Sequence, residues 1–127
     1  GFNSVHSSVL NAEEARSYDN GQRGFNSEYD SLLIANHSES FNNQYQGYFS
    51  NQHSLLSAEN ASSRNNGGEG MYAHGMSMIS ARFASASGNG KTAFYSYHMS
   101  LLDRQQYQGG GTSPGIGAEG NNGSVTR

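Results

Sequence analysis

The stretch GFNSVHSSVLNAEEARSYDNGQR (residues 1–23) is followed at once by GFNSEYDSLLIANHSESFNNQYQ (residues 24–46), and the two segments share their first four residues and much of what comes after. The same period continues without a gap through windows that begin at Gly47, Gly70 and Ala93. A fixed period of this length is typical of proteins that stack one supersecondary unit on its copies. The sequence therefore predicts five repeats, which begin at residues 1, 24, 47, 70 and 93.

Aligned columns appear when the places within each window are numbered from 1 to 23. Place 2 is aromatic or Met, place 8 is always Ser, place 10 is always a large aliphatic residue, and place 20 is Asn in the first four windows. These columns are Phe2, Phe25, Tyr48, Met71 and Phe94; Ser8, Ser31, Ser54, Ser77 and Ser100; Leu10, Leu33, Leu56, Ile79 and Leu102; and Asn20, Asn43, Asn66 and Asn89. We predict that these residues form the core and self-assembly columns, with place 10 pointing inward.

The spacing of the columns favours β-strands over helices. Places 2, 4, 8, 10 and 12 are even-numbered, as expected when alternate side chains of a strand share one face. Gly, Ser and Asn, which dominate the chain, are poor helix formers, although short helices remain the alternative. The apolar neighbours at places 9 and 10 indicate either a corner or a second apolar face, and the Asn and Gly residues at places 18–23 predict a turn.

The predicted fold class is all-β: a β-solenoid of five 23-residue rungs, each with one or two short strands, over residues 1–108. Such rungs can stack into a cross-β-like filament. Residues 109–127 are rich in Gly and leave the columns, so we expect a flexible tail. The low apolar content of 33% and the mean hydropathy of −0.76 are also found in disordered chains, and a recently duplicated disordered repeat is the alternative.

Composition and motifs argue against several function classes. A net charge of −3 without a basic stripe argues against nucleic-acid binding, and no apolar stretch is long enough to span a membrane. The glycine motif GIGAEG (residues 115–120) lacks a βαβ context, and SASGNGKT (residues 85–92) is the fourth copy of the turn. We therefore expect no cofactor.

Catalytic and metal sites are not expected either. The five histidines, His6, His37, His53, His74 and His98, occupy places 6, 14, 7, 5 and 6, and no two neighbouring windows have a histidine at the same place, so a metal-binding ladder is not predicted. The serine columns are not accompanied by columns of His and Asp, and we interpret them as small interior residues rather than nucleophiles. Tyrosines such as Tyr95 and Tyr97 fit a stacked aromatic ladder, with sugar binding as the alternative.

In layout the chain resembles the bacterial curlins, secreted proteins that form functional amyloid. The resemblance covers residues 1 to about 108: five imperfect repeats of equal length, rich in Gly, Asn and Ser and without Cys. It implies an extracellular fibre subunit for adhesion or biofilm matrix, exported through a secretion channel and assembled on a nucleator. The curlin columns of Gln are missing here, and Ser and Asn columns stand in their place.

Self-assembly is also expected from the first and fifth windows, which keep the repeat columns instead of a polar cap. Contacts between identical rungs would be head-to-tail and would not close, which produces filaments. The partner predicted for this chain is therefore another copy of itself. Because the chain begins at Gly1, we also expect a processed, secreted product. The alternatives are a monomeric solenoid that binds a repetitive ligand such as polysaccharide or ice, and an animal silk or cement protein.

Overall fold

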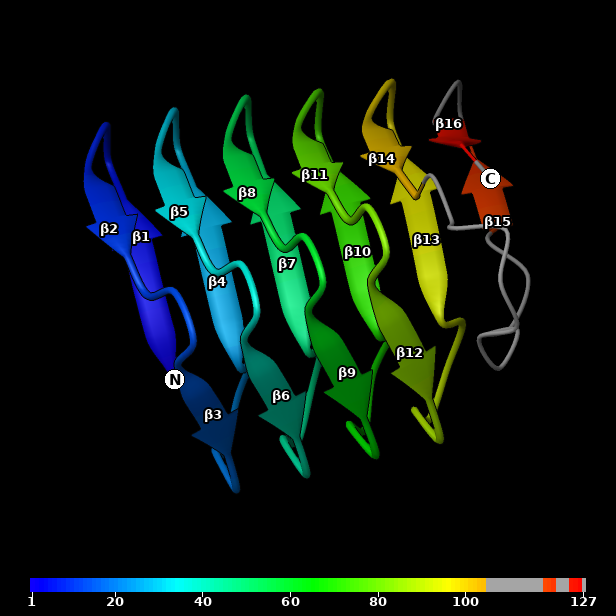
Figure 1. Cartoon of the computed structure of the whole chain (residues 1–127). Coiled ribbons are helices and arrows are strands. Elements are labelled where there is room, and N and C mark those ends of the chain that lie inside the picture. The colour runs from blue at the N-terminus through cyan, green and yellow to red at the C-terminus, as the bar shows by residue number, and fades with distance from the viewer. Residues whose placement is uncertain (105–117, 121–123, 127) are drawn as a thin grey trace.

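The computed structural model describes residues 1–104, 118–120 and 124–126. Within these residues the chain forms short parallel strands and turns, and no helix. Successive repeats of the sequence form successive rungs that lie side by side. Figure 1 shows the equivalent strands of these rungs arranged in parallel rows. The protein is thus an all-β solenoid, as the sequence predicts.

Each complete rung contains three strands rather than the one or two that the sequence predicts. In the first rung these are β1 (Phe2–Val5), β2 (Val9–Asn11) and β3 (Arg16–Tyr18). The following rungs contain β4 (Phe25–Glu28), β5 (Leu32–Ile34) and β6 (Glu39–Phe41); β7 (Tyr48–Asn51), β8 (Leu55–Ser57) and β9 (Ser62–Arg64); β10 (Met71–His74), β11 (Met78–Ser80) and β12 (Ser85–Ser87); and β13 (Phe94–Tyr97) and β14 (Leu101–Asp103). The third strand escapes prediction because its inward residue, at place 17, is a small Ser or Ala, so no large apolar residue of places 16–18 faces the core.

Equivalent strands of successive rungs form three parallel sheets. The first sheet has the order β1-β4-β7-β10-β13-β15, the second contains β2, β5, β8, β11, β14 and β16, and the third contains β3, β6, β9 and β12. Pairing is always between equivalent places, such as Phe2 with Phe25 and Leu33 with Leu56. The chain turns back after the first strand of each rung, so that the first and second sheets pack together, and the third sheet extends beyond them (Figure 1).

The pairing register continues into the last part of the chain. Strands β15 (Ala118–Gly120) and β16 (Ser124–Thr126) pair with β13 and β14, and Val125 lies beside Leu102, its equivalent one repeat earlier. The sequence columns did not indicate these strands, although Val125 does preserve the aliphatic character of place 10. Of the segment predicted to be a flexible tail, residues 109–117, 121–123 and 127 lie outside the described residues.

Three corners in each of the four complete rungs reverse or bend the chain through residues in the left-handed region. In the first rung these are His6 and Ser7, Glu14, and Asp19, with φ between 52° and 59°. This conformation costs a non-glycine residue roughly 1–2 kcal/mol. Backbone bonds to the next rung hold it in place: Ser7 N donates to Tyr29 O (2.9 Å) and Glu14 N to Asn36 O (2.9 Å). The corners are therefore stacked as regularly as the strands.

The core is narrow and consists of stacked columns. At place 10, Leu33, Leu56, Ile79 and Leu102 are completely buried, and Leu10 in the first rung is half-buried. The aromatic column at place 2 stacks its rings, with centroids 5.1 Å apart for Phe2 and Phe25 and 4.8 Å apart for Phe25 and Tyr48. Small residues complete the interior, including the buried alanines Ala12, Ala35, Ala58 and Ala81 at place 12.

Two residues that depart from the repeat, Tyr48 at place 2 and Ser38 at place 15, contact each other in the core. Tyr48 is the one Tyr at place 2, and its hydroxyl lies 2.9 Å from the Ser38 hydroxyl, with which it shares a hydrogen bond. Place 15 is Ala15, Ala61 and Ala84 in the other complete rungs. Burial raises the pKa of Tyr48 well above its usual range, so the hydroxyl stays neutral. The two departures from the repeat thus compensate each other.

We predict that two adjacent leucines of the middle rung respond very differently to a carboxylate. Leu56→Asp places a charge in the core between Leu33 and Ile79, and it should lower the free energy of unfolding by about 3–5 kcal/mol. Leu55→Asp changes a side chain that is 38% exposed and should cost about 1 kcal/mol or less. Urea unfolding followed by circular dichroism measures both values, and equal losses would contradict the inward and outward assignment.

Candidate functional site

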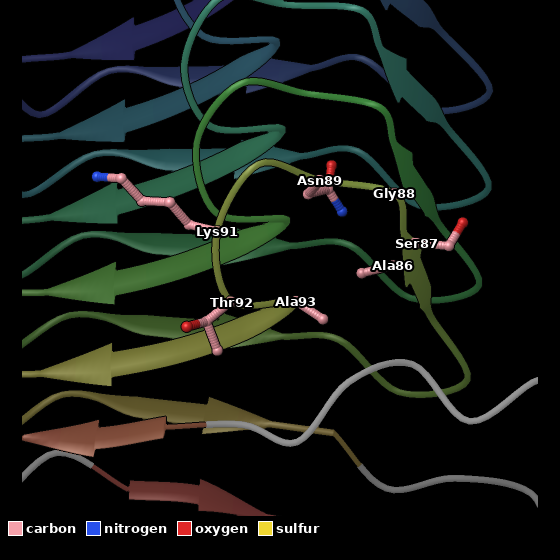
Figure 2. Close-up of a pocket in the computed structure, with 7 residues that line it drawn as sticks. All are labelled: Ala86, Ser87, Gly88, Asn89, Lys91, Thr92 and Ala93. Atoms are coloured by element: carbon pink, nitrogen blue, oxygen red, sulfur yellow. The ribbon is translucent and has the colours of Figure 1, made fainter.

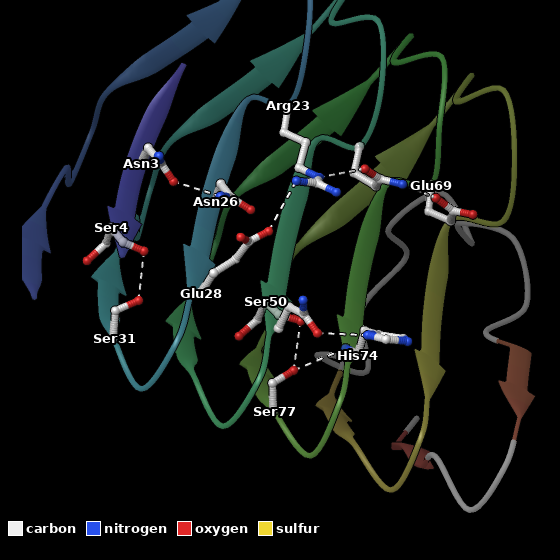
Figure 3. A network of polar contacts seen from close by, with 12 residues as sticks. Asn3, Ser4, Arg23, Asn26, Glu28, Ser31, Ser50, Glu69, His74 and Ser77 are labelled. Carbon is white, nitrogen blue, oxygen red and sulfur yellow. Dashed lines mark hydrogen bonds and ion pairs between the residues drawn. The ribbon is translucent and has the colours of Figure 1, made fainter. Parts of the chain in front are cut away.

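The predicted columns lie mainly inside the solenoid and act as ladders. At place 8, Ser31, Ser54, Ser77 and Ser100 are buried, whereas Ser8 of the first rung is exposed. Ser31 Oγ donates to Ser4 O (2.7 Å), and Ser77 Oγ donates to Ser50 O (2.7 Å), as Figure 3 shows. The serine hydroxyls therefore bridge neighbouring rungs by bonding to backbone carbonyl groups.

The asparagine column at place 20 forms a continuous amide ladder. Asn20 Nδ2 donates to Asn43 Oδ1 (2.6 Å), Asn43 Nδ2 to Asn66 Oδ1 (2.8 Å), and Asn66 Nδ2 to Asn89 Oδ1 (3.0 Å). Each receiving Oδ1 atom also accepts a backbone N–H from the preceding rung, such as that of Asn43 for Asn66. Stacked amides of this kind satisfy a polar interior without charge.

A serine column at place 17, which the sequence interpretation missed, fastens this ladder to the next rung. Ser40 Oγ accepts from Asn43 Nδ2 (3.0 Å) and donates to Gly47 O (3.0 Å). The approach is so close that a Cβ atom on Gly47 would lie 2.1 Å from Ser63 Oγ, which explains the glycines at place 1. The signal was present in the sequence, because place 17 is Ser, Ser, Ser and Ala in the four complete rungs.

Charged and amide groups alternate along place 23. Arg23 Nε donates to Gln46 Oε1 (3.0 Å), and Gln46 Nε2 donates to Glu69 Oε2 (2.7 Å). Arg23 also pairs with Glu28 (3.2 Å), and Lys91 Nζ lies 3.5 Å from Glu69 Oε1. Figure 3 shows the part of this series of polar contacts that runs from Glu28 to Glu69 across the rungs. Opposite charges are separated by a neutral amide, so stacking at this place does not bring like charges together.

The outer face of the second sheet carries a row of aliphatic side chains. We name Val9, Leu32, Leu55, Met78 and Leu101, all at place 9, the apolar stripe. Val9 is 70% exposed and Leu55 38%, and the other three are half-buried. Met76 and Met99, at the preceding corner, are exposed as well. The sequence left two interpretations of the apolar pair at places 9 and 10, a corner or a second apolar face. The structure shows a second apolar face, because the two side chains lie on opposite faces of one strand.

Aromatic rings gather on the outer face of the first sheet. We name Phe49, Tyr72, Tyr95 and Tyr97 the aromatic face. The ring centroid of Tyr72 lies 5.3 Å from that of Phe49 and 4.9 Å from that of Tyr95. The ring centroids of Tyr95 and Tyr97 are 6.0 Å apart. Burial, followed by the neighbouring Tyr95 and Glu69, raises the pKa of Tyr72 to about 12. Its hydroxyl group is therefore neutral at physiological pH and can donate a hydrogen bond.

The described residues contain few other features suited to a ligand. A hollow at the edge of β12 is lined by Ala86, Ser87, Gly88, Asn89, Lys91, Thr92 and Ala93 (Figure 2). Lys91 is the one charged residue of this lining, and it pairs with Glu69. In the described part of the chain, no group of three or more His, Asp or Glu side chains is arranged to hold a metal ion, and no helix could cross a membrane.

We predict that the amide ladder contributes strongly to stability. Asn66→Ala removes the acceptor of the Asn43 side chain and backbone and the side-chain donor to Asn89, and it should cost about 3 kcal/mol of unfolding free energy. Asn26→Ala is the control, because Asn26 donates one bond to the exposed Asn3, and it should cost less than about 1 kcal/mol. Thermal unfolding compares the two variants. Similar losses of unfolding free energy in the two variants would contradict a stabilising role of the amide ladder.

Comparisons of this chain with protein-family models, with curated proteins and with solved structures give no match. Any functional assignment therefore rests on the ladders, on the apolar stripe and on the aromatic face. The resemblance to curlins remains a resemblance of repeat layout.

Proposed function

We propose that this chain is a self-associating structural subunit of an extracellular fibre. The observation that carries the proposal is the apolar stripe, a straight row of aliphatic side chains on the outer face of the second sheet. Large exposed apolar patches on soluble proteins mark sites of association. An enzyme would instead need a convergent set of reactive groups, which the ladders do not provide.

A second copy of the chain is a suitable partner for the apolar stripe. The stripe is built from in-register parallel strands, so its side chains follow one another at the strand spacing of about 4.8 Å. An identical row on another solenoid has the same spacing, and two such rows can interdigitate as in a steric zipper. Lateral pairing would bury Val9 and Leu55 together with the methionines of the neighbouring corner.

Growth along the solenoid axis uses the regularity of the rungs. The four complete rungs present the same three strands, and the asparagine ladder runs through them in one direction. One rung can therefore receive another through the same backbone and amide bonds that join neighbouring rungs here. Because this contact is head-to-tail, repetition gives an open filament rather than a closed ring.

The extracellular part of the proposal comes from the resemblance to curlins. That resemblance implies export through a channel, assembly on a nucleator and a role in adhesion or biofilm matrix. The dependence of each rung on its neighbours is compatible with transport as an unfolded chain, because the ladders are satisfied only when rungs are stacked. Assembly after export would then be coupled to folding.

The aromatic face supports a second candidate, a solenoid that binds polysaccharide. Tyr72, Tyr95 and Tyr97 offer flat rings with hydroxyl groups on one sheet face, and amphipathic rings of this kind are common in binding sites. A protein of this kind would stay monomeric at high concentration and bind soluble glycans. The two candidates are therefore distinguished by the state of the purified chain.

We predict that the chain of 127 residues assembles into unbranched filaments that diffract near 4.7 Å, and that Leu55→Asp slows this assembly about tenfold or more. The variant places a charge in the middle of the apolar stripe, between Leu32 and Met78. Electron microscopy, fibre diffraction and sedimentation of the soluble fraction against time provide the measurement.

Ser85→Asp is the matched control, since it adds the same charge to an exposed strand residue of the third sheet, away from the stripe. It should assemble at the rate of the unmodified chain. Equal assembly of Leu55→Asp would exclude the stripe as the lateral contact. A stable monomer of the unmodified chain at high concentration would contradict the fibre proposal and favour the glycan-binding candidate.

A further inference from the structure

We propose that His74 and His98 form a binding site for a divalent transition-metal ion on the outer face of the first sheet. His98 Nδ1 lies 2.9 Å from His74 Nε2. Two nitrogen ligands at about 2.0–2.1 Å from one metal ion, in neighbouring positions at a right angle, are themselves about 2.9 Å apart. The observed separation therefore fits a shared ion without a change in the backbone.

The solenoid geometry brings these histidines together although they share no column. His74 is the last residue of β10, at place 5, and His98 follows β13 at the corner, at place 6 of the next rung. His98 has a left-handed backbone with φ of 53°, and its ring lies beside that of His74 with centroids 4.8 Å apart. The sequence argument against a metal ladder considered only equal places, and it did not consider neighbouring places of adjacent rungs.

Asn51 prepares His74 to act as a ligand. Asn51, in the rung on the other side of His74, has its Oδ1 atom 2.7 Å from His74 Nδ1. Since an amide oxygen can only accept, His74 Nδ1 donates to Asn51, and its Nε2 carries the lone pair that accepts the hydrogen bond of His98 Nδ1. A metal ion shared by Nε2 of His74 and Nδ1 of His98 would replace this proton, with His98 in the tautomer that is protonated on Nε2. Metal-bound histidines generally donate their second ring N–H to an oxygen in this way.

The pair is also accessible from solvent. His98 is exposed and open to solvent, so an ion can enter and water can occupy its remaining coordination positions.

Imidazole nitrogen suits transition metals rather than Mg²⁺ or Ca²⁺, and the right-angled arrangement suits Ni²⁺ and Cu²⁺ rather than tetrahedral Zn²⁺. The other histidines lie in different surroundings: His6 stacks on Tyr29, His53 is 3.9 Å from Asp30, and His37 occupies a corner. A metal ion bound by His74 and His98 would link the fourth and fifth rungs from outside. It should thereby stabilise the folded chain by mass action.

Titration of the full chain with Ni²⁺ at pH 7.5, followed by calorimetry, tests the site. We expect one ion per chain, and a loss of affinity of about tenfold or more in His98→Gln and in His74→Gln. Ni²⁺ should also raise the thermal unfolding midpoint of the unmodified chain but not that of His98→Gln. Paramagnetic broadening of the two imidazole signals in nuclear magnetic resonance spectra would locate the ion.

His37→Asn is the matched control, because it removes an exposed histidine at a corner where Asn tolerates the left-handed backbone. It should bind Ni²⁺ like the unmodified chain. Since His98 is exposed, His98→Gln should remain folded, as its circular dichroism spectrum will show. Absence of Ni²⁺ binding by the unmodified chain, or unchanged affinity in both His74→Gln and His98→Gln, would overturn the proposal.

Discussion

Parallel, in-register pairing of equivalent residues in successive repeats is the interaction on which the whole structure depends. It places each strand residue beside its equivalent in the next rung, as for Phe25 with Tyr48 and Leu33 with Leu56. Every side chain must therefore tolerate its own kind at a distance of about 4.8 Å. Aromatic rings, aliphatic chains, hydroxyls and amides meet this condition, whereas repeated like charges would not.

This constraint also explains how so polar a chain maintains an ordered interior. Only 33% of the residues are apolar, and buried serines and asparagines share the interior with the apolar columns. The serine and asparagine ladders supply further cohesion, because each side chain is both donor and acceptor along the stack. Where a column changes its residue, a compensating change occurs nearby, as for Tyr48 and Ser38.

Side chains on the outer faces do not have to fill the interior or satisfy buried polar groups, and the rungs differ most at these positions. Place 3 changes from Asn3 and Asn26 to Phe49, Tyr72 and Tyr95, which creates the aromatic face over the later rungs. By contrast, place 9 remains aliphatic throughout although it faces outward. An apolar residue that is retained on an exposed face in every rung is costly in water, and association with another copy would remove that cost.

Much of the architecture could be predicted from the sequence alone. The repeat period, the solenoid class, the inward place 10 and the polar turn at place 20 follow from columns, because each column records one repeated environment. The third strand was missed since its inward residues, such as Ser17 and Ser40, are small and polar. Strands β15 and β16 were missed because their segment is rich in Gly, and Gly is a weak indicator of strand.

Only the tertiary structure decided which neighbours of different columns meet. The sequence placed an apolar pair at places 9 and 10, but the pleat of the strand decided that Leu56 faces the core and Leu55 faces outward. His74 and His98 likewise occupy different places in the sequence repeat. The conformation of the corner after β13 brings their rings together. Columns report contacts between equal places, whereas contacts between unequal places depend on the backbone angles at the corners. Those angles are held by bonds between rungs that exist only once the rungs are stacked.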